Sequence, residues 1–289
     1  MALHRNFIAL APLIVGALSC STPLDTLPRR CDEIDPNVCN TPVAQRERLA
    51  TYRQADLAAR PRPGGPVAVS NVVVTAIDDH LEARGDTGDI WVQEVINDPM
   101  FNGCAPMPDG RRVCGVQLFA PSTIPTGATL LVGDLVTVTG GSYDEFNCTP
   151  CCAPPRPPCT FTDRTLPEFS RAGVERVGTG VQPIVVPATV QQIIDGGDRY
   201  VGVLVRIEGE VMLETPSSGD ANRGEIRIVG GLNLAPQLGP LQDRTGRPLY
   251  DAAARRLNFT RVRNVTGIVS YFFGPKLFPR SPEDFEALP

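Results

Sequence analysis

Histidine, tryptophan and lysine are scarce in this sequence, and their scarcity limits the chemistry that it can carry. Among 289 residues there are 2 histidines and 1 tryptophan, and Lys276 is the only lysine among 27 basic residues. A Ser–His–Asp triad, a histidine general base and a histidine-rich metal site all need histidines placed in concert, so the count nearly excludes them. No Gly-x-Ser-x-Gly motif and no complete glycine-rich dinucleotide fingerprint occurs either. We therefore expect a protein that is not an enzyme and holds no cofactor.

Basic residues are also not in excess over acidic ones. The net charge is −5 at pH 7 and the pI is about 5.2, whereas a protein that binds nucleic acid non-specifically is usually basic. Hydrophobic residues make up 42% of the chain, which is enough for a packed core and excludes a wholly disordered protein. The 29 prolines and 27 glycines argue against long helices and favour short strands joined by turns.

The N-terminus is typical of an exported protein. Residues 7–18 are apolar but too few to span a bilayer, which needs about 20 residues. The run ends at Ala17-Leu18-Ser19-Cys20, which resembles a bacterial lipobox. We therefore expect residues 1–19 to be a lipoprotein signal peptide and Cys20 to be lipidated. The protein would then be anchored to the cell envelope at the outer membrane. The alternative is an ordinary signal peptide that leaves Cys20 as a free thiol.

The number of cysteines agrees with lipidation, because the chain has 9 and eight remain without Cys20. An even number suits disulfides in an exported protein. Two short-range pairs are expected, Cys31 with Cys39 and Cys104 with Cys114, because each pair flanks a turn-rich stretch. The pairing of the remaining four stays open, and a zinc site is the alternative for them. These four residues are Cys148, Cys151, Cys152 and Cys159.

Runs of alternating apolar residues begin at Val67 and continue to the end of the chain, which predicts an all-β fold. In the first half we expect strands at Val67–Ile77, Asp89–Val95, Val113–Phe119, Leu130–Thr139 and Phe169–Val177. In the second half we expect them at Gly202–Leu213, Glu225–Val229, Arg261–Phe273 and Lys276–Phe278. The expected organisation is a flexible tether at 20–65, a first domain at 66–179 with a cysteine-rich insert at 148–159, a linker at 180–198 and a second domain at 199–289.

Several of these strands resemble those of bacterial secreted OB-fold (oligonucleotide/oligosaccharide-binding) domains. Val132–Gly140, with its Gly-Asp turn and final glycine, is similar to the fourth strand of such a domain, and Ile90–Glu94 is similar to the second. Tyr200–Gly209 resembles the opening strand of a second copy, and Asn264–Gly274 resembles a strand near its end. The resemblance implies two OB-like five-stranded Greek-key barrels in tandem. The insert at 148–159 departs from the family pattern.

The resemblance and the residue types together suggest candidate ligand-binding residues. Trp91 and Phe119 fall on the expected second and third strands, where OB-folds present aromatic rings to single-stranded nucleic acid. Tyr271 belongs to a run of aromatics in which at least one ring must point outward. Arg261 and Arg263 share a strand face that suits an anion. The alternatives are burial of the aromatic rings in a core and a salt-bridged face for the arginines.

Acidic residues cluster between the first two expected strands, around His80. A loop of oxygen ligands is typical of a calcium site, but the spacing matches no EF-hand. We therefore expect a solvated hairpin loop and no metal. The acidic residues are Asp78, Asp79, Glu82, Asp86 and Asp89.

The function expected from the sequence is non-catalytic binding or scaffolding at the cell envelope. The partner would be a protein, a glycan or a nucleic acid, in addition to the membrane that holds the lipid anchor. The resemblance offers an alternative, an accessory subunit of a secreted nuclease or phosphoesterase system. A hydrolase is the third class, because a pair of catalytic carboxylates leaves little local signature.

Overall fold

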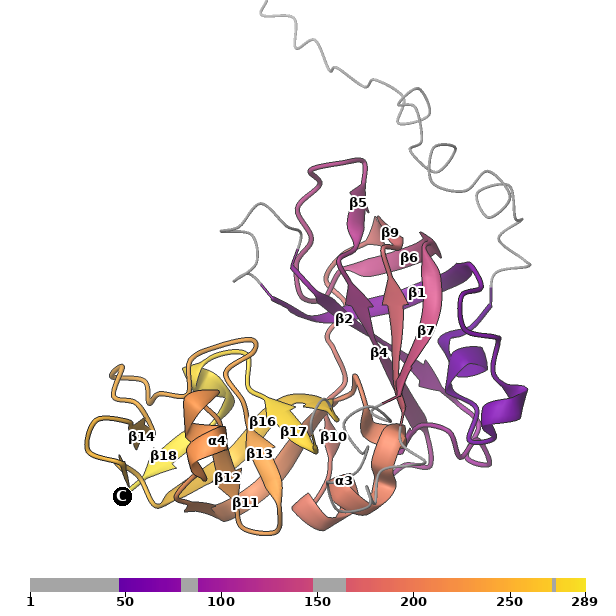
Figure 1. Ribbon diagram of the computed structural model, residues 1–289. Helices are drawn as coiled ribbons and strands as arrows, with labels where there is room; N and C mark the ends of the chain where they lie inside the picture. The colour runs from indigo at the N-terminus through magenta and orange to yellow at the C-terminus, as the bar shows by residue number, and fades with distance from the viewer. Residues whose placement is uncertain (1–46, 79–87, 148–164, 272–273) are drawn as a thin grey trace, which may run out of the picture.

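The structure is a computed structural model that describes residues 47–78, 88–147, 165–271 and 274–289. Strands make up 45% of it and helices 12%, so the predicted all-β class is confirmed. Figure 1 shows two β bodies next to each other, the first formed by the N-terminal half of the described chain and the second by the C-terminal half. No helix in these ranges is both long enough and apolar enough to cross a membrane.

The first body is one sheet in the order β5-β9-β6-β1-β2-β4-β8-β7, with β3 paired to β4. Its strands are β1 Val67–Ile77, β2 Ile90–Ile96, β3 Ala105–Pro106, β4 Arg112–Phe119, β5 Ser122–Ile124, β6 Leu135–Gly140, β7 Ser142–Asn147, β8 Thr165–Ser170 and β9 Gly173–Gly178. Valines of β1 at positions 67, 69, 72 and 74 are fully buried. A bulge between Val69 and Val72 shifts the alternation by one residue, so that all four valines enter the core.

The two flanks of this sheet are joined by a bend in the chain. Strand β8 runs parallel to β4, and β9 runs antiparallel to β6. Only Arg171 and Ala172 separate β8 from β9, and Arg171 has a φ of 57°, a left-handed conformation that turns the backbone sharply. A Cβ at the neighbouring Gly141 would lie 2.3 Å from the Ser170 oxygen, so only glycine fits beside the bend. Residues 165–178 therefore act as one bent strand that brings the sheet round on itself.

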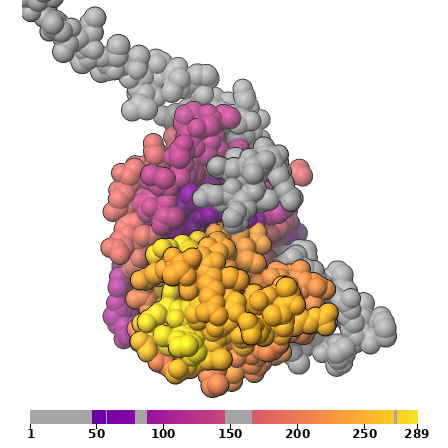
Figure 2. Space-filling model, turned by 90° about the vertical axis from the view of Figure 1, so that its left-hand side faces the viewer, coloured from indigo at the N-terminus to yellow at the C-terminus, as the bar shows by residue number. Residues whose placement is uncertain are grey.

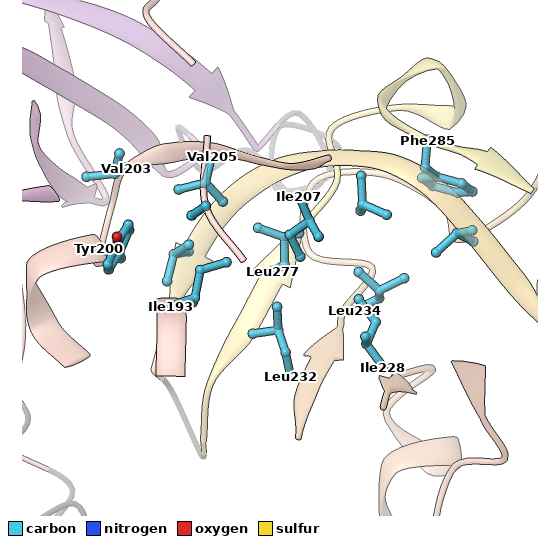
Figure 3. Packing of buried hydrophobic residues seen from close by; sticks show 14 of the residues in the cluster. Ile193, Tyr200, Val203, Val205, Ile207, Ile228, Leu232, Leu234, Leu277 and Phe285 are labelled. Atoms are coloured by element: carbon cyan, nitrogen blue, oxygen red, sulfur yellow. The ribbon is translucent and has the colours of Figure 1, made fainter. Parts of the chain in front are cut away.

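The second body contains a closed five-stranded barrel. Its ring runs β11-β12-β13-β17-β16 and closes through the pairing of β16 with β11. The strands of this body are β10 Val186–Pro187, β11 Leu204–Glu214, β12 Ile226–Ile228, β13 Leu232–Leu234, β16 Arg261–Ser270, β17 Lys276–Phe278 and β18 Glu286–Leu288, with a separate pair β14 Tyr250–Asp251 and β15 Arg256–Leu257. Figure 3 shows Ile207, Leu234 and Leu277 converging from three different strands on the barrel core.

Short helices complete the fold, and one of them lies where an extended linker is expected. They are η3 Leu49–Arg53, η4 Leu57–Ala59, α3 Val190–Gly196, η7 Gly197–Tyr200, α4 Ser218–Asn222 and η8 Pro282–Asp284. Helix α3 begins with a reciprocal capping box, in which Thr189 Oγ1 accepts from the Gln192 amide at 3.1 Å. Ile193 of α3 is buried in the core of the second body. The cap and this burial stabilise a helix in a segment whose prolines favour extended chain.

Residues 47–60, which we call the strap, correct the predicted extent of the tether. Leu49 and Tyr52 are buried in the core of the first body. The ring of Tyr52 meets the rings of Tyr143 and Phe169 edge to face, at 5.1 and 4.9 Å between centroids. Two large apolar side chains are enough to hold this segment against the barrel. The rest of the predicted tether lies outside the described residues, as do the signal peptide and Cys20.

A disulfide joins Cys104 to Cys114, with 4.8 Å between their Cα atoms. It is one of the two pairs that the sequence predicts, and it links the stretch before β3 to β4. Both residues are fully buried in the core of the first body. The other predicted disulfide cysteines fall outside the described ranges, so their pairing stays a prediction. They are Cys31, Cys39, Cys148, Cys151, Cys152 and Cys159.

Candidate functional site

The two bodies meet with their backbones in contact. A Cβ at Gly115 of β4 would lie 2.2 Å from the carbonyl carbon of Gly202, and a Cβ at Gly202 would lie 2.5 Å from the Val116 nitrogen. Real Cβ atoms do not approach other atoms so closely, so neither position accepts a side chain without movement of the backbone. Figure 2 shows the C-terminal half packed directly against the N-terminal half.

Trp91 lies within this interface. Its side chain is only 1% exposed and belongs to an apolar cluster that includes Leu204 and Ile268 of the second body. Its ring meets that of Phe278 edge to face, with 6.3 Å between centroids and 77° between planes. The second barrel thus covers the strand face on which the sequence predicts an exposed aromatic platform. Trp91 is thus buried in a core, which is the alternative that the sequence left open for it.

Beside Trp91 the interface opens into a cavity of about 350 Å³. Trp91 and Phe278 form part of its wall, together with Leu166, and Phe119 is a further aromatic residue of its lining. Its polar lining comes mainly from the carboxylates of Asp89 and Glu168 and from the side-chain amides of Gln117 and Gln237. Both bodies contribute, because Gln237 and Phe278 come from the second body and the other residues named here come from the first.

Strand register explains why polar side chains from distant parts of the sequence meet here. Trp91 on β2 pairs with Gln117 on β4, and Gln117 pairs with Glu168 on β8. The residues that precede and follow Trp91 and Gln117, such as Val92 and Val116, enter the core of the first body. Since side chains alternate between the two faces of a strand, this row projects outward from the first barrel toward the second.

The two carboxylates of the cavity are held by uncharged donors. Gln117 Nε2 donates to Asp89 Oδ2 at 2.8 Å and the Ala120 amide donates to Asp89 Oδ1 at 3.2 Å. Burial raises the pKa of Asp89, and the charge of Asp78 adds to this rise. Burial also raises the pKa of Glu168, which accepts a hydrogen bond of 3.3 Å from Ser170 Oγ. No ion pair between either carboxylate and an arginine or lysine occurs among the residues that the structure describes.

The cavity therefore combines aromatic rings with carboxylates and amides. Comparisons with family models, with curated proteins and with solved structures find no match to this chain. What the cavity binds has to be inferred from its own side chains.

A larger hollow of about 560 Å³ lies near the start of the strap and the Val181–Ile184 segment. Arg48 Nε donates to Glu94 Oε1 at 2.6 Å, and Glu47 adds a second carboxylate to the lining. No aromatic ring of a described residue belongs to the lining, which makes this hollow the weaker candidate for recognising a ligand.

The structure brings two of the predicted ligand-binding residues together, Trp91 and Phe119, and places the other three elsewhere. Phe119 is 46% exposed and lines the inter-barrel cavity beside Trp91. Tyr271 is buried in the core of the second body, where its hydroxyl donates to the Ile193 carbonyl, which corrects its assignment as an outward-facing contact residue. Arg261 and Arg263 lie on β16, away from the cavity lining.

Arg261 and Arg263 lie on a salt-bridged face of the second body, which is the alternative that the sequence left open to an anion-binding face. Arg261 Nη1 lies 2.9 Å from Glu210 Oε2, and Arg263 pairs with both Glu210 and Glu286. The hydrogen bond from Arg263 lowers the pKa of Glu210. Because each arginine faces a carboxylate on an adjacent strand, little positive charge is left for an external anion.

Sequence reasoning missed Gln117 and Glu168, and it treated Asp89 as a member of an acidic cluster and as the first residue of an expected strand, but not as a ligand-binding residue. The available signal was the presence of polar residues at outward-facing positions of apolar strands. His80 and the acidic residues at 79, 82 and 86 lie outside the described residues. In the described part of the chain no group of three or more His, Cys, Asp or Glu side chains is placed to hold a metal ion.

The side chains of the cavity suit a ligand that carries hydrogen-bond donors, because carboxylates and side-chain amides around aromatic rings can accept hydrogen bonds from it.

Proposed function

We propose that this protein is a non-catalytic binding lipoprotein of the bacterial cell envelope, and that it binds its ligand in the cavity between its two barrels. The single observation that supports the binding role is the meeting of Asp89, Gln117 and Glu168 with aromatic rings in a cavity of about 350 Å³. A volume of this size, with an apolar wall and a few convergent polar groups, is typical of a small-molecule or side-chain site.

The proposal includes two OB-like barrels in tandem. Numbered along the chain, the closed ring of the second body takes its strands in the order first, second, third, fifth and fourth. Its third and fifth strands, β13 and β17, run parallel. In the first body, β4 and the bent strand β8–β9 repeat the same relation. This order supports an OB-like Greek-key topology for both bodies.

The cavity chemistry disfavours nucleic acid as the ligand. Phosphates would meet the carboxylates of Asp89 and Glu168, and no described arginine or lysine belongs to the cavity lining. Proteins that bind single-stranded nucleic acid use stacking rings flanked by basic residues. A ligand that is neutral or positively charged, and that donates hydrogen bonds, suits the lining better.

The binding role is tested with a variant that fills the cavity. Gln117→Trp places a large ring between Asp89 and Glu168, and Gln191→Trp, on the exposed surface of α3, is the matched control. Soluble envelope glycans, short peptides and single-stranded DNA are titrated against the wild type and both variants. We expect one glycan or peptide class to bind the wild type and Gln191→Trp and to lose at least about tenfold in affinity for Gln117→Trp.

This site would be rejected if every ligand that binds the protein bound Gln117→Trp and Gln191→Trp with equal affinity. The cellular location is tested separately by mass spectrometry of the mature N-terminus, where we expect diacylglycerol on Cys20. An unmodified N-terminus at another residue would reject the lipid anchor.

A further inference from the structure

We propose that the cavity between the barrels recognises an organic cation, meaning a guanidinium or ammonium group carried on an apolar stem. This inference rests on the proposed function, because it specifies the ligand class of the same cavity. The geometry that leads to it is the meeting, in one small cavity, of aromatic rings with carboxylates that pair with no described arginine or lysine.

The first argument is the charge of the enclosure. Asp89 and Glu168 both line it, and Asp144 adds its charge from β7, where it is the register partner of Glu168. These three carboxylates accept hydrogen bonds from Gln117, Ser170 and Ser142, which are all uncharged donors. Removing carboxylates from water without a counter-charge is unfavourable, and a bound cation would relieve that penalty.

The second argument is the aromatic content of the same wall. The rings of Trp91 and Phe278 meet edge to face at 6.3 Å, and Phe119 is a large apolar side chain left 46% exposed. Aromatic faces attract cations through their quadrupole, and the attraction strengthens where water is excluded. They also offer an apolar contact for an alkyl stem. A site for a bare inorganic ion would not need these aromatic rings.

The third argument is size and ligand count. A cavity of about 350 Å³ is at the small end of ligand pockets and fits one long side chain or one small molecule. The described residues offer no cluster of three or more His, Cys, Asp or Glu that would enclose a metal ion. The cation that fits is therefore organic, singly charged and elongated.

The test compares two ligands of nearly the same shape, one charged and one neutral, in which a carbonyl oxygen of the neutral ligand replaces one NH2 group of the cation. Butylguanidinium and its neutral analogue butylurea are titrated against the folded full-length chain at about 0.15 M salt, which screens diffuse electrostatics. Ligand-observed NMR reports binding, and fluorescence of Trp91, the only tryptophan, reports occupancy of the cavity. We expect butylguanidinium to bind with a Kd on the order of 1 mM and butylurea at least about tenfold more weakly.

Matched variants locate the interaction. Glu168→Gln keeps the shape of the side chain and removes its charge, and Glu208→Gln removes the same charge from an exposed position of β11 outside the cavity lining. We expect Glu168→Gln to weaken butylguanidinium binding at least about tenfold and Glu208→Gln to leave it unchanged. Asp89→Asn provides a second variant of the lining with the same expected loss.

The pH dependence has a definite sign. Burial raises the pKa values of Asp89 and Glu168 in the free protein, and a bound cation favours their ionised forms. Affinity for butylguanidinium should therefore fall as pH is lowered through these raised pKa values, while any binding of butylurea should not.

Other outcomes overturn the inference. Equal binding of butylurea and butylguanidinium would show that the cavity selects shape and not charge, and would leave the proposed binding function intact. Equal losses in Glu168→Gln and Glu208→Gln would show that attraction is to the net charge of the protein. An absence of butylguanidinium binding by the folded wild type would also overturn it. Failure of the proposed function itself would be seen differently, because ligands would then bind Gln117→Trp with the same affinity as the wild type.

Discussion

Two groups of carboxylates near the inter-barrel interface have opposite surroundings. Glu145 of β7 and Asp198 of η7 share the guanidinium of Arg60, which lies 2.9 Å from Glu145 and 2.5 Å from Asp198 and whose side chain is 1% exposed. Asp89 and Glu168 have only amide and hydroxyl donors among the described residues. A buried cation of the chain thus lies where carboxylates join the strap to both bodies, whereas no described arginine or lysine pairs with the carboxylates of the cavity.

This difference separates structural charge from charge available to a ligand. Breaking a buried ion pair leaves an uncompensated charge and is strongly unfavourable. Carboxylates kept without a cation instead weaken the folded state unless something else binds them. The comparison predicts that variants at the two groups change stability in opposite directions.

The largest effect is expected at Arg60. Arg60→Met keeps much of the apolar stem and removes the guanidinium that contacts Glu145 and Asp198. We expect a loss of about 3–5 kcal/mol in the free energy of unfolding, measured by chemical denaturation. A loss below about 1 kcal/mol would mean that this buried network stabilises the fold no better than a surface ion pair does.

A smaller effect is expected where the backbones touch. Gly115→Ala puts a Cβ 2.2 Å from the Gly202 carbonyl carbon and should destabilise the protein by about 1–3 kcal/mol. If the bodies move apart, the emission of Trp91 should shift to longer wavelength, because its ring leaves an apolar environment. Gly219→Ala is the control, since the nearest atom to its Cβ is 3.8 Å away. Unchanged emission and stability in Gly115→Ala would contradict the close contact.

A still smaller effect of the opposite sign is expected at Glu168. Its pKa is raised by burial in the folded protein, so its ionised form destabilises the fold at neutral pH, and this penalty disappears as pH falls through the raised pKa. Glu168→Gln should therefore raise Tm at pH 7 by roughly 1–2 °C and have no advantage in acid. Thermal melts from pH 4 to pH 8 measure this, and a variant less stable than wild type at pH 7 would refute the assignment.

The smallest effect is expected on the exposed face of β16. Arg263→Ala removes ion pairs with Glu210 and Glu286, but all three side chains are more than one third exposed. We expect a loss in the free energy of unfolding too small to resolve by chemical denaturation, and a still smaller one at high salt. A loss as large as that of Arg60→Met would remove the distinction between buried and surface charge pairs.

Strand positions were the part of the fold that the sequence predicted best. The expected strand at Val67–Ile77 has the same bounds as β1, because the segment is rich in β-branched residues. The Gly-Asp turn before β6 was also predicted. Gly133 has a φ of 93°, and Asp134 Oδ2 accepts from the Leu131 amide at 2.9 Å. Such features depend only on neighbouring residues, which a sequence shows directly.

Features that depend on distant partners were not predicted. The strap has no alternating apolar pattern, and the rings that its Tyr52 contacts, those of Tyr143 and Phe169, lie far along the chain. Strand β13 has only three residues, too few for a visible alternation. The polar row of the cavity exists because register pairs Gln117 with Glu168, and no local pattern reveals a pairing across such a separation.

The strap also imposes an order of assembly on the chain. Its apolar residues Leu49 and Tyr52 belong to the first body's core, yet Phe169 must be in place before Tyr52 has its ring partners. Arg60 can form its ion pair with a second carboxylate only after Asp198 has come into place. Contacts between such separated segments form slowly compared with local hairpins. The first body therefore cannot complete its contacts with the strap until residues as far along the chain as Asp198 are in place.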